Sequence, residues 1–214
     1  MITLSNINSY DMKSSYKAVL VFLSLSLVLV SFTSDQSENR PLTVESNHST
    51  VQFIVPISNG ITRVTGKFND YTIDIDYNDS DFTKSNISAT IKVASIDTGI
   101  DGRDDHLRTP DFFDVEKFPK ITFTSNRIES SEDGYMINGE FSMHGVSKQI
   151  EFPMKITGKD GENTIGFSSR LTINRIDYGV GADFKHSSME NFLSEDIHIE
   201  IDFWTKKKKP KKTD

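Results

Sequence analysis

The chain has 214 residues with a formal net charge of −7, and it contains no cysteine. The lack of cysteine excludes disulfide-stapled mini-proteins and Cys-ligated zinc or iron–sulfur sites. The length fits one domain of ordinary size, and 15 Phe and 6 Tyr supply apolar side chains for a core. The charge is uneven, because the segment 206–214 is Lys-rich and the acidic excess lies within 41–205. An acidic body argues against general nucleic-acid binding.

An apolar run near the start of the chain, AVLVFLSLSLVLV at 18–30, follows two lysines and precedes polar residues. This order is typical of a secretory signal peptide, and the run is short for a membrane span of about 20 residues. We therefore expect a signal peptide over 1–34, with Met12 as an alternative start, and a linker over 35–41. The predicted location is periplasmic or secreted. No A-x-A cleavage pattern is present, so a leader that stays on the chain as an anchor is the alternative.

From residue 42 onward, apolar and polar residues alternate in many short segments, such as ISATIKV at 87–93 and IHIEIDF at 197–203. Successive side chains of a strand point to opposite faces, so this period of two predicts strands with one apolar and one solvated face. Turn sequences such as Ser58-Asn59-Gly60 separate the segments. The predicted strands lie near 50–56, 61–68, 70–77, 87–93, 120–128, 135–143, 150–156, 164–174 and 197–203.

Eight or so strands in about 165 residues, joined by simple hairpins, leave two all-β architectures, an up-and-down barrel and a β-sandwich. The strands are long, and closing the sheet removes exposed edges, so we predict an eight-stranded antiparallel up-and-down barrel. A barrel of this size is either filled by side chains or holds one small ligand. Phenylalanines spread through the body suit both interiors, a packed core and a cavity for a long apolar ligand.

The longest connection, residues 97–119, interrupts the strand pattern. We expect Asp101 to cap a short helix that runs to Arg108 and ends before Pro110. A further turn is expected at 111–115. Long ordered connections are more often functional than short ones, so the side chains here are candidates for a site.

Sequence patterns of catalysis and metal binding are missing. G-x-S-x-G, H-E-x-x-H and the P-loop pattern do not occur. The five histidines have no tight ligand spacing, and Asp101, Asp104 and Asp105 do not match the calcium-loop pattern. We therefore predict a protein that is not an enzyme and needs no metal or cofactor.

Four segments resemble, in the right order, motifs of the YceI-like family of polyisoprenoid-binding, lipocalin-like proteins. The segment 49–68 ends in VTGKF, 102–123 holds R-x-x-H-L, D-F-F-D and K-F-P-K-I-T-F, 141–148 reads FSMHGVSK, and 175–180 reads RIDYGV. The resemblance covers 42–205. It implies an extended lipocalin-like barrel that binds a polyisoprenoid, an isoprenoid quinone or a fatty-acid-like lipid, for transport, storage or stress protection. The family is not known for a shared catalytic mechanism.

The resemblance and the aromatic content together nominate ligand-binding residues. Leu107, Phe112 and Phe113 are expected to cover the cavity mouth. Arg103, His106, His144 and Arg175 are expected to meet a polar head group, or to hold loops through hydrogen bonds and ion pairs. The full set of candidates is Phe53, Phe68, Arg103, His106, Leu107, Phe112, Phe113, Phe123, His144, Arg175 and Tyr178.

Two other functions stay open. One is a structural or interaction module with a packed barrel, and the other is an enzyme that acts on a barrel-bound lipid with His106 or His144 as general base. The tail 206–214 is expected to be a disordered extension, with contact to a membrane surface through the tail or the leader as the alternative. A homodimer is a further possibility.

Overall fold

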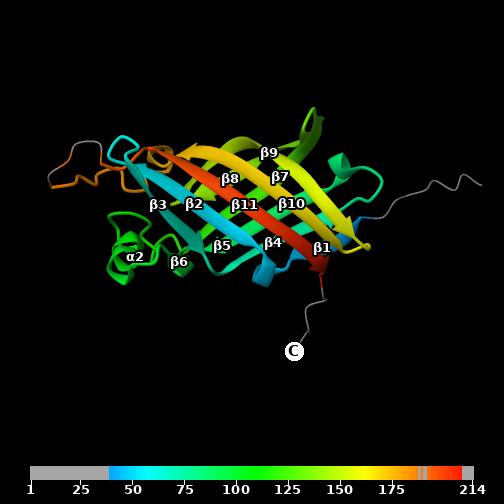
Figure 1. Ribbon diagram of the computed structural model, residues 1–214, viewed down its shortest axis with the longest axis horizontal. Coiled ribbons are helices and arrows are strands. Elements are labelled where there is room, and N and C mark those ends of the chain that lie inside the picture. The colour runs from blue at the N-terminus through cyan, green and yellow to red at the C-terminus, as the bar shows by residue number, and fades with distance from the viewer. Residues whose placement is uncertain (1–38, 188, 190–191, 209–214) are drawn as a thin grey trace, which may run out of the picture. The chain divides into compact units, whose positions relative to one another are not determined.

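The computed structural model describes residues 39–187, 189 and 192–208, and strands dominate this part of the chain (Figure 1). The predicted signal peptide at 1–34 and the tail from residue 209 lie outside the described residues. Within the described part, no helix is long and apolar enough to cross a membrane.

The strands form one antiparallel sheet that closes on itself through the pairing of the first strand with the last. From β7 to β11, each strand pairs with the next one along the chain, as in an up-and-down barrel. In order, they are β1 (Arg40–Val44), β2 (Thr50–Ile57), β3 (Thr62–Phe68), β4 (Tyr71–Tyr77), β5 (Asn86–Lys92), β6 (Ile96–Asp97), β7 (Lys120–Ser131), β8 (Gly134–Met143), β9 (Val146–Asp160), β10 (Thr164–Asn174) and β11 (Asp196–Lys207).

Three staves of the barrel are each built from two short strands. β1 and β2 run in the same direction along β11, one at each end of it, with the 3-10 turn η1 (Ser46–His48) between them. β3 and β4 are separated by residues 69–70, and β5 and β6 by the 3-10 turn η3 (Val93–Ser95). With these pairs counted as single staves, the predicted closed eight-stranded barrel is confirmed.

The first strand and the end of the last one differ from the expected boundaries. β1 begins at Arg40, inside the segment expected to be a linker. The sequence did not predict this strand, because five residues are too few to show a clear alternation of apolar and polar side chains. β11 continues to Lys207, so two lysines of the predicted tail belong to the barrel. Lys206 pairs with Glu45 (2.5 Å), and Lys208 pairs with Asp74.

The predicted helix in the long connection is present as α2 (Asp101–Arg108), and it ends before Pro110 as expected. The expected N-cap is wrong. Ile100 occupies that position, and Asp101 belongs to the first turn. The buried carboxylate of Asp104 instead ties the helix to the segment directly after β6, because it accepts hydrogen bonds from Thr98 N (2.9 Å) and Thr98 Oγ1 (2.5 Å).

One end of the barrel, which lies on the right in Figure 1, is closed by the aromatic side chains of Phe82, Tyr135 and Phe167. The 3-10 turn η2 (Phe82–Lys84) begins where the Asp81 carboxylate accepts from Thr83 N at 3.1 Å. Phe82 is only 4% exposed, and its ring centroid lies 4.7 Å from Tyr135 and 5.6 Å from Phe167. We call this the closed end. The opposite end, the mouth, carries α2, the β2–β3 turn and the connection from 175 to 195 (Figure 1).

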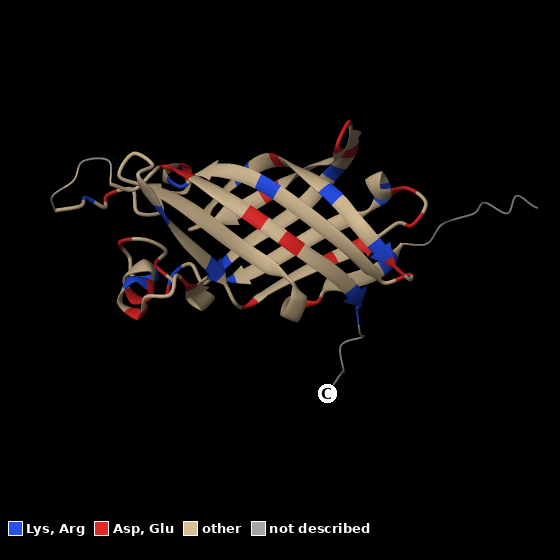
Figure 2. Cartoon of the chain, viewed as in Figure 1, with Lys and Arg blue, Asp and Glu red and all other residues tan. Residues whose placement is uncertain are grey.

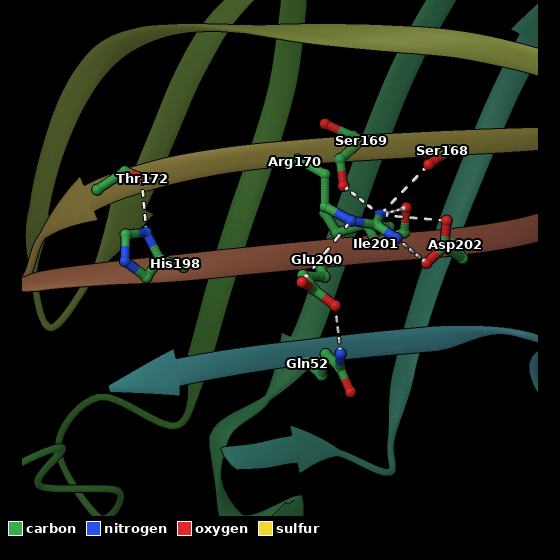
Figure 3. Close-up of polar contacts among 9 residues, drawn as sticks. All are labelled: Gln52, Ser168, Ser169, Arg170, Thr172, His198, Glu200, Ile201 and Asp202. Atoms are coloured by element: carbon green, nitrogen blue, oxygen red, sulfur yellow. Dashed lines mark hydrogen bonds and ion pairs between the residues drawn. The ribbon is translucent and has the colours of Figure 1, made fainter. Parts of the chain in front are cut away.

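Charged residues are scattered over the outer face of the strands, whereas α2 carries several acidic ones (Figure 2). On the outer face of β10, β11 and β2, the Arg170 guanidinium binds both carboxylate oxygens of Asp202 (3.1 and 2.6 Å), and Glu200 accepts from Gln52 (Figure 3). His198 lies on the same polar face. These pairs fix the register of the three strands, because a slip of one residue would turn each side chain inward.

Candidate functional site

A cavity of about 320 Å³ occupies the mouth half of the barrel. This volume is at the lower end of the range for small-molecule sites, about 300–1,000 Å³. The walls come from the inward-facing residues of β2 to β5 and β7 to β11, and they are almost wholly apolar. Among the described lining residues, the polar or charged ones are Gln52, Arg103, His106, Thr122 and Arg175, and Gln52 directs its side chain to Glu200 on the outer face.

Two wall aromatics lie flat against neighbouring strands because a glycine stands there. A Cβ on Gly66 would come within 2.3 Å of the Phe53 ring, and a Cβ on Gly139 within 2.6 Å of the Phe123 ring. Any larger residue would therefore push these rings toward the barrel axis. The two glycines keep the middle of the mouth half open.

The mouth is covered by contacts between two connections that are distant in sequence. The cavity is lined at its mouth by three residues of the 97–119 connection, Leu107, Phe112 and Phe113. Phe184 of the 175–195 connection lines it there as well. The rings of Phe112 and Phe184 have centroids 5.0 Å apart, and the His106 ring lies 5.1 Å from Phe112. A ligand that enters from the mouth must therefore separate these aromatic rings or pass beside them.

Arg103 and Arg175 both line the cavity, and both use part of the guanidinium to hold the loops. Arg103 donates to Thr98 Oγ1 (2.7 Å) and to Thr98 O (2.8 Å). Arg175 donates to Ser194 O (2.9 Å), Val180 O (2.8 Å) and Gly181 O (2.7 Å).

Burial lowers the pKa of Arg175, although the charge of Glu195 opposes this effect. An arginine guanidinium nevertheless stays protonated at neutral pH. None of the described lining residues carries a carboxylate, so the two guanidinium groups give an apolar cavity a positive rim. Such a rim favours a ligand with an anionic or hydrogen-bond-accepting group at the mouth, because charge-assisted hydrogen bonds are stronger than hydrogen bonds between neutral groups.

Nine of the eleven residues predicted for the site line the cavity: Phe53, Phe68, Arg103, His106, Leu107, Phe112, Phe113, Phe123 and Arg175. His106 also pairs with Asp111, with Nε2 3.0 Å from the carboxylate.

The other two, His144 and Tyr178, lie outside the cavity lining and support the mouth from behind. His144 Nδ1 is 3.0 Å from Tyr178 O, and its ring packs on Phe118 at 4.5 Å. His144 and Gly145 form the two-residue β8–β9 turn with φ values of 52° and 78°, which are typical of a type I′ hairpin turn. Burial and the nearby Asp177 charge raise the pKa of Tyr178.

Several lining residues were not among the predicted site residues. Phe184, Phe192 and Leu193 come from the 175–195 connection, where no periodic pattern marks an inward face. The sequence feature that could have identified them is the presence of large apolar side chains in a long connection, where most residues are polar. The aliphatic wall residues, such as Ile199 and Leu171, follow from the alternation, but alternation does not tell how far the cavity reaches along each strand.

The fold and the site thus define a closed antiparallel barrel with an internal apolar cavity and a covered mouth. The family model described as the YceI-like domain matches residues 42–204. The chain belongs to the YceI-like domain family.

Relatives and solved structures agree with this assignment. A UPF0312 protein of Photorhabdus laumondii is 28% identical over 178 residues, which cover 81% of this chain and 92% of that protein. The crystal structure of the Campylobacter jejuni YCEI protein is 33% identical, covers 70% of this chain and 88% of that chain, and has a TM-score of 0.61.

More distant structures share the fold. A structure described as a polyisoprenoid binding domain from Saccharophagus degradans is 15% identical, with a TM-score of 0.60, over 78% of this chain and 98% of that chain. Burkholderia cenocepacia BcnA is 21% identical, with a TM-score of 0.68, over 75% of this chain and 98% of that chain.

Proposed function

We propose that this protein binds a single-chain amphiphilic lipid, with the apolar chain inside the barrel and the polar head at the mouth. The observation that carries the proposal is the apolar cavity of about 320 Å³ in the mouth half of the barrel. Burial of an apolar chain there is favourable by roughly 0.8 kcal/mol per methylene group. A fully packed interior, which an interaction module would have, does not agree with this cavity.

The head group belongs near Arg103, His106 and Arg175, because they are the charged or titratable side chains among the described lining residues. The polyisoprenoid-binding description of the Saccharophagus degradans domain supports a lipid of the isoprenoid type, and a fatty acid offers the same chemistry. The protein would act without catalysis, as a carrier, store or protective binder of the lipid. Export to the periplasm or beyond fits the predicted leader and is part of the proposal.

Native mass spectrometry of protein purified without detergent tests the binding, together with titration of delipidated protein with the fluorescent fatty acid cis-parinaric acid. We expect a co-purifying lipid mass and saturable probe binding. Leu171 lines the cavity and Thr172 is its exposed neighbour on the same strand, so they offer a matched pair of variants. Leu171→Trp should weaken probe binding at least about tenfold by filling the cavity, whereas Thr172→Trp should bind normally.

Absence of any lipid mass combined with absence of probe binding would overturn the proposal. The enzyme alternative makes a different prediction, because His106 would then act as a general base on the bound lipid. Chemical change of a bound lipid over time, lost in His106→Gln, would favour that alternative. N-terminal sequencing and fractionation of the native cells would test the leader and the location.

A further inference from the structure

The half of the barrel beyond the cavity is filled by its own side chains. Six of its inward residues are at most 1% exposed, and none of these six lines the cavity. Seen along the barrel, the cavity therefore stops at about the level of Ile73 on β4 and Phe203 on β11. The filled half contains Leu42, Ile75, Tyr77, Ile137, Ile165 and Phe167.

The depth of the cavity follows from the lining residues of β11, which run from Ile197 to Phe203. These residues are six positions apart, which is about 20 Å at ~3.4 Å per residue. Barrel strands tilt by about 40° to the axis, so the cavity is ~15 Å deep. This is about half of the ~30 Å hydrocarbon thickness of a bilayer, the length of chain that one leaflet holds.

Phe82 lies at the centre of the filled half. Its ring packs between Tyr77, Tyr135 and Phe167, with centroids 5.8, 4.7 and 5.6 Å away. Phe167 in turn stacks on Phe203, the last cavity residue of β11, at 5.1 Å. The floor of the cavity thus rests on a continuous stack of rings that reaches the closed end.

Three inward hydroxyl groups in and below the floor, those of Ser125, Ser169 and Thr205, are already hydrogen-bonded to the backbone. Ser125 Oγ accepts from Ile87 N (2.8 Å), and Ser169 Oγ donates to Pro153 O (2.7 Å). Thr205 Oγ1 accepts from Ile165 N (3.1 Å). The floor therefore offers no place for a polar head group, and a ligand enters with its apolar end first.

We propose that the Phe82 stack limits the length of the lipid chain, so that this protein prefers chains of about 15 Å and discriminates against longer ones. The inference rests on the proposed function, since it names the class of ligand within it. Each added methylene should strengthen binding about fourfold until the chain reaches the floor. Beyond that length, further groups must stay outside the mouth or displace the rings, so affinity should stop rising and then fall.

The test measures affinities of the delipidated full chain for a homologous series of straight-chain fatty acids and for geraniol, farnesol, geranylgeraniol and solanesol. We expect a break in affinity at an extended chain length of about 15 Å. Affinity that rises steadily through the longest probes would overturn the limit while leaving the proposed function intact. A failure to bind any probe would overturn both.

Two variants should move the break in opposite directions. Phe82→Ala removes the central ring, so longer chains should gain at least about tenfold in affinity relative to short ones. Ala89→Phe adds a ring to the wall near the floor, so the break should shift to shorter chains. The controls are Phe118→Ala, whose ring lies outside the cavity, and Ser88→Phe, whose side chain is exposed beside Ala89.

Ala89→Phe fills open space and leaves the ring stack intact, so it decides the question even where Phe82→Ala does not fold. A break that stays in place in Ala89→Phe would overturn the proposal.

Discussion

The ring of Phe112 rests on the ring of Phe184 at a centroid distance of 5.0 Å, and this contact joins the two long connections across the mouth of the barrel. A ligand that enters from the mouth has to separate or pass this pair. We therefore expect this contact to control the rate of ligand exchange, and the apolar cavity walls to control the affinity for the ligand.

Phe184→Ala should accelerate ligand exchange. Removing one ring of the pair costs about 0.5–1.5 kcal/mol of aromatic contact energy, so the dissociation rate of a bound probe should rise several-fold. Stopped-flow displacement of cis-parinaric acid measures this rate. Trp204→Ala, which removes a 40% exposed ring that does not line the cavity, serves as the control. An unchanged dissociation rate in Phe184→Ala would show that the pair does not cover the entry route.

Arg175→Lys should destabilise the mouth although it keeps the positive charge. The guanidinium donates to three backbone carbonyls in a fixed fork, which an ammonium group cannot reproduce. Leaving partly buried carbonyls without donors should lower the free energy of unfolding by about 1–3 kcal/mol. Urea denaturation of the two proteins gives this difference. Equal midpoints would mean that the carbonyls find other donors.

Arg103→Gln should weaken the binding of a fatty acid more than that of the alcohol with the same chain. Arg103 lines an apolar cavity in which no described lining residue carries a carboxylate, so its guanidinium can interact with an anionic head group while it holds Thr98. The loss should be about tenfold for the acid, because hydrogen bonds to charged groups are worth about 1.5–3 kcal/mol. Titration of both probes to both proteins checks it. Equal losses for acid and alcohol would point to a damaged mouth.

Asp202→Asn should remove a small, pH-dependent contribution to stability. Burial opposes ionisation of Asp202, but hydrogen bonds from Arg170 and Ser168 lower its pKa. A carboxyl whose pKa is lower in the folded protein stabilises the fold above the unfolded-state pKa of about 3.9, and this contribution disappears as pH falls through the folded-state pKa. Since both side chains are about half exposed, the difference at neutral pH should not exceed ~1 kcal/mol.

Thermal melts of Asp202→Asn and of the unchanged protein at neutral and acidic pH test this dependence. The two melting temperatures should converge under acidic conditions. A gap that persists or widens there would contradict the role of the ion pair.

Alternation in the sequence was enough to predict which residues face inward, but not where the interior is hollow. Ile199 and Thr205 occupy the same inward face of β11, yet Ile199 lines the cavity and Thr205 is fully buried in the filled half. The filled half also contains Phe82, which reaches the interior from a turn between strands. A single aromatic residue in a turn has no periodicity, so local sequence could not assign it to the core.

The mouth was predicted in part for a similar reason. Leu107, Phe112 and Phe113 stand in a long connection with a recognisable motif, and they do line the cavity. Phe184 meets them from a distant connection, and that contact depends on the closed barrel. Asp101 and Asp104 show the limit at the level of single residues. Both fit the start of a helix by type, but only the fold brings Thr98 within reach of Asp104.

The seam between β1 and β11 has a consequence for the order in which the barrel is made. β11 is the last strand of the barrel in chain order, and its two flanks are β10 on one side and β1 with β2 on the other. Until residues 196–207 dock, the folding chain presents an open sheet with two unpaired edges. The ring therefore closes only when β11 docks, and the sheet edges are most exposed just before that step.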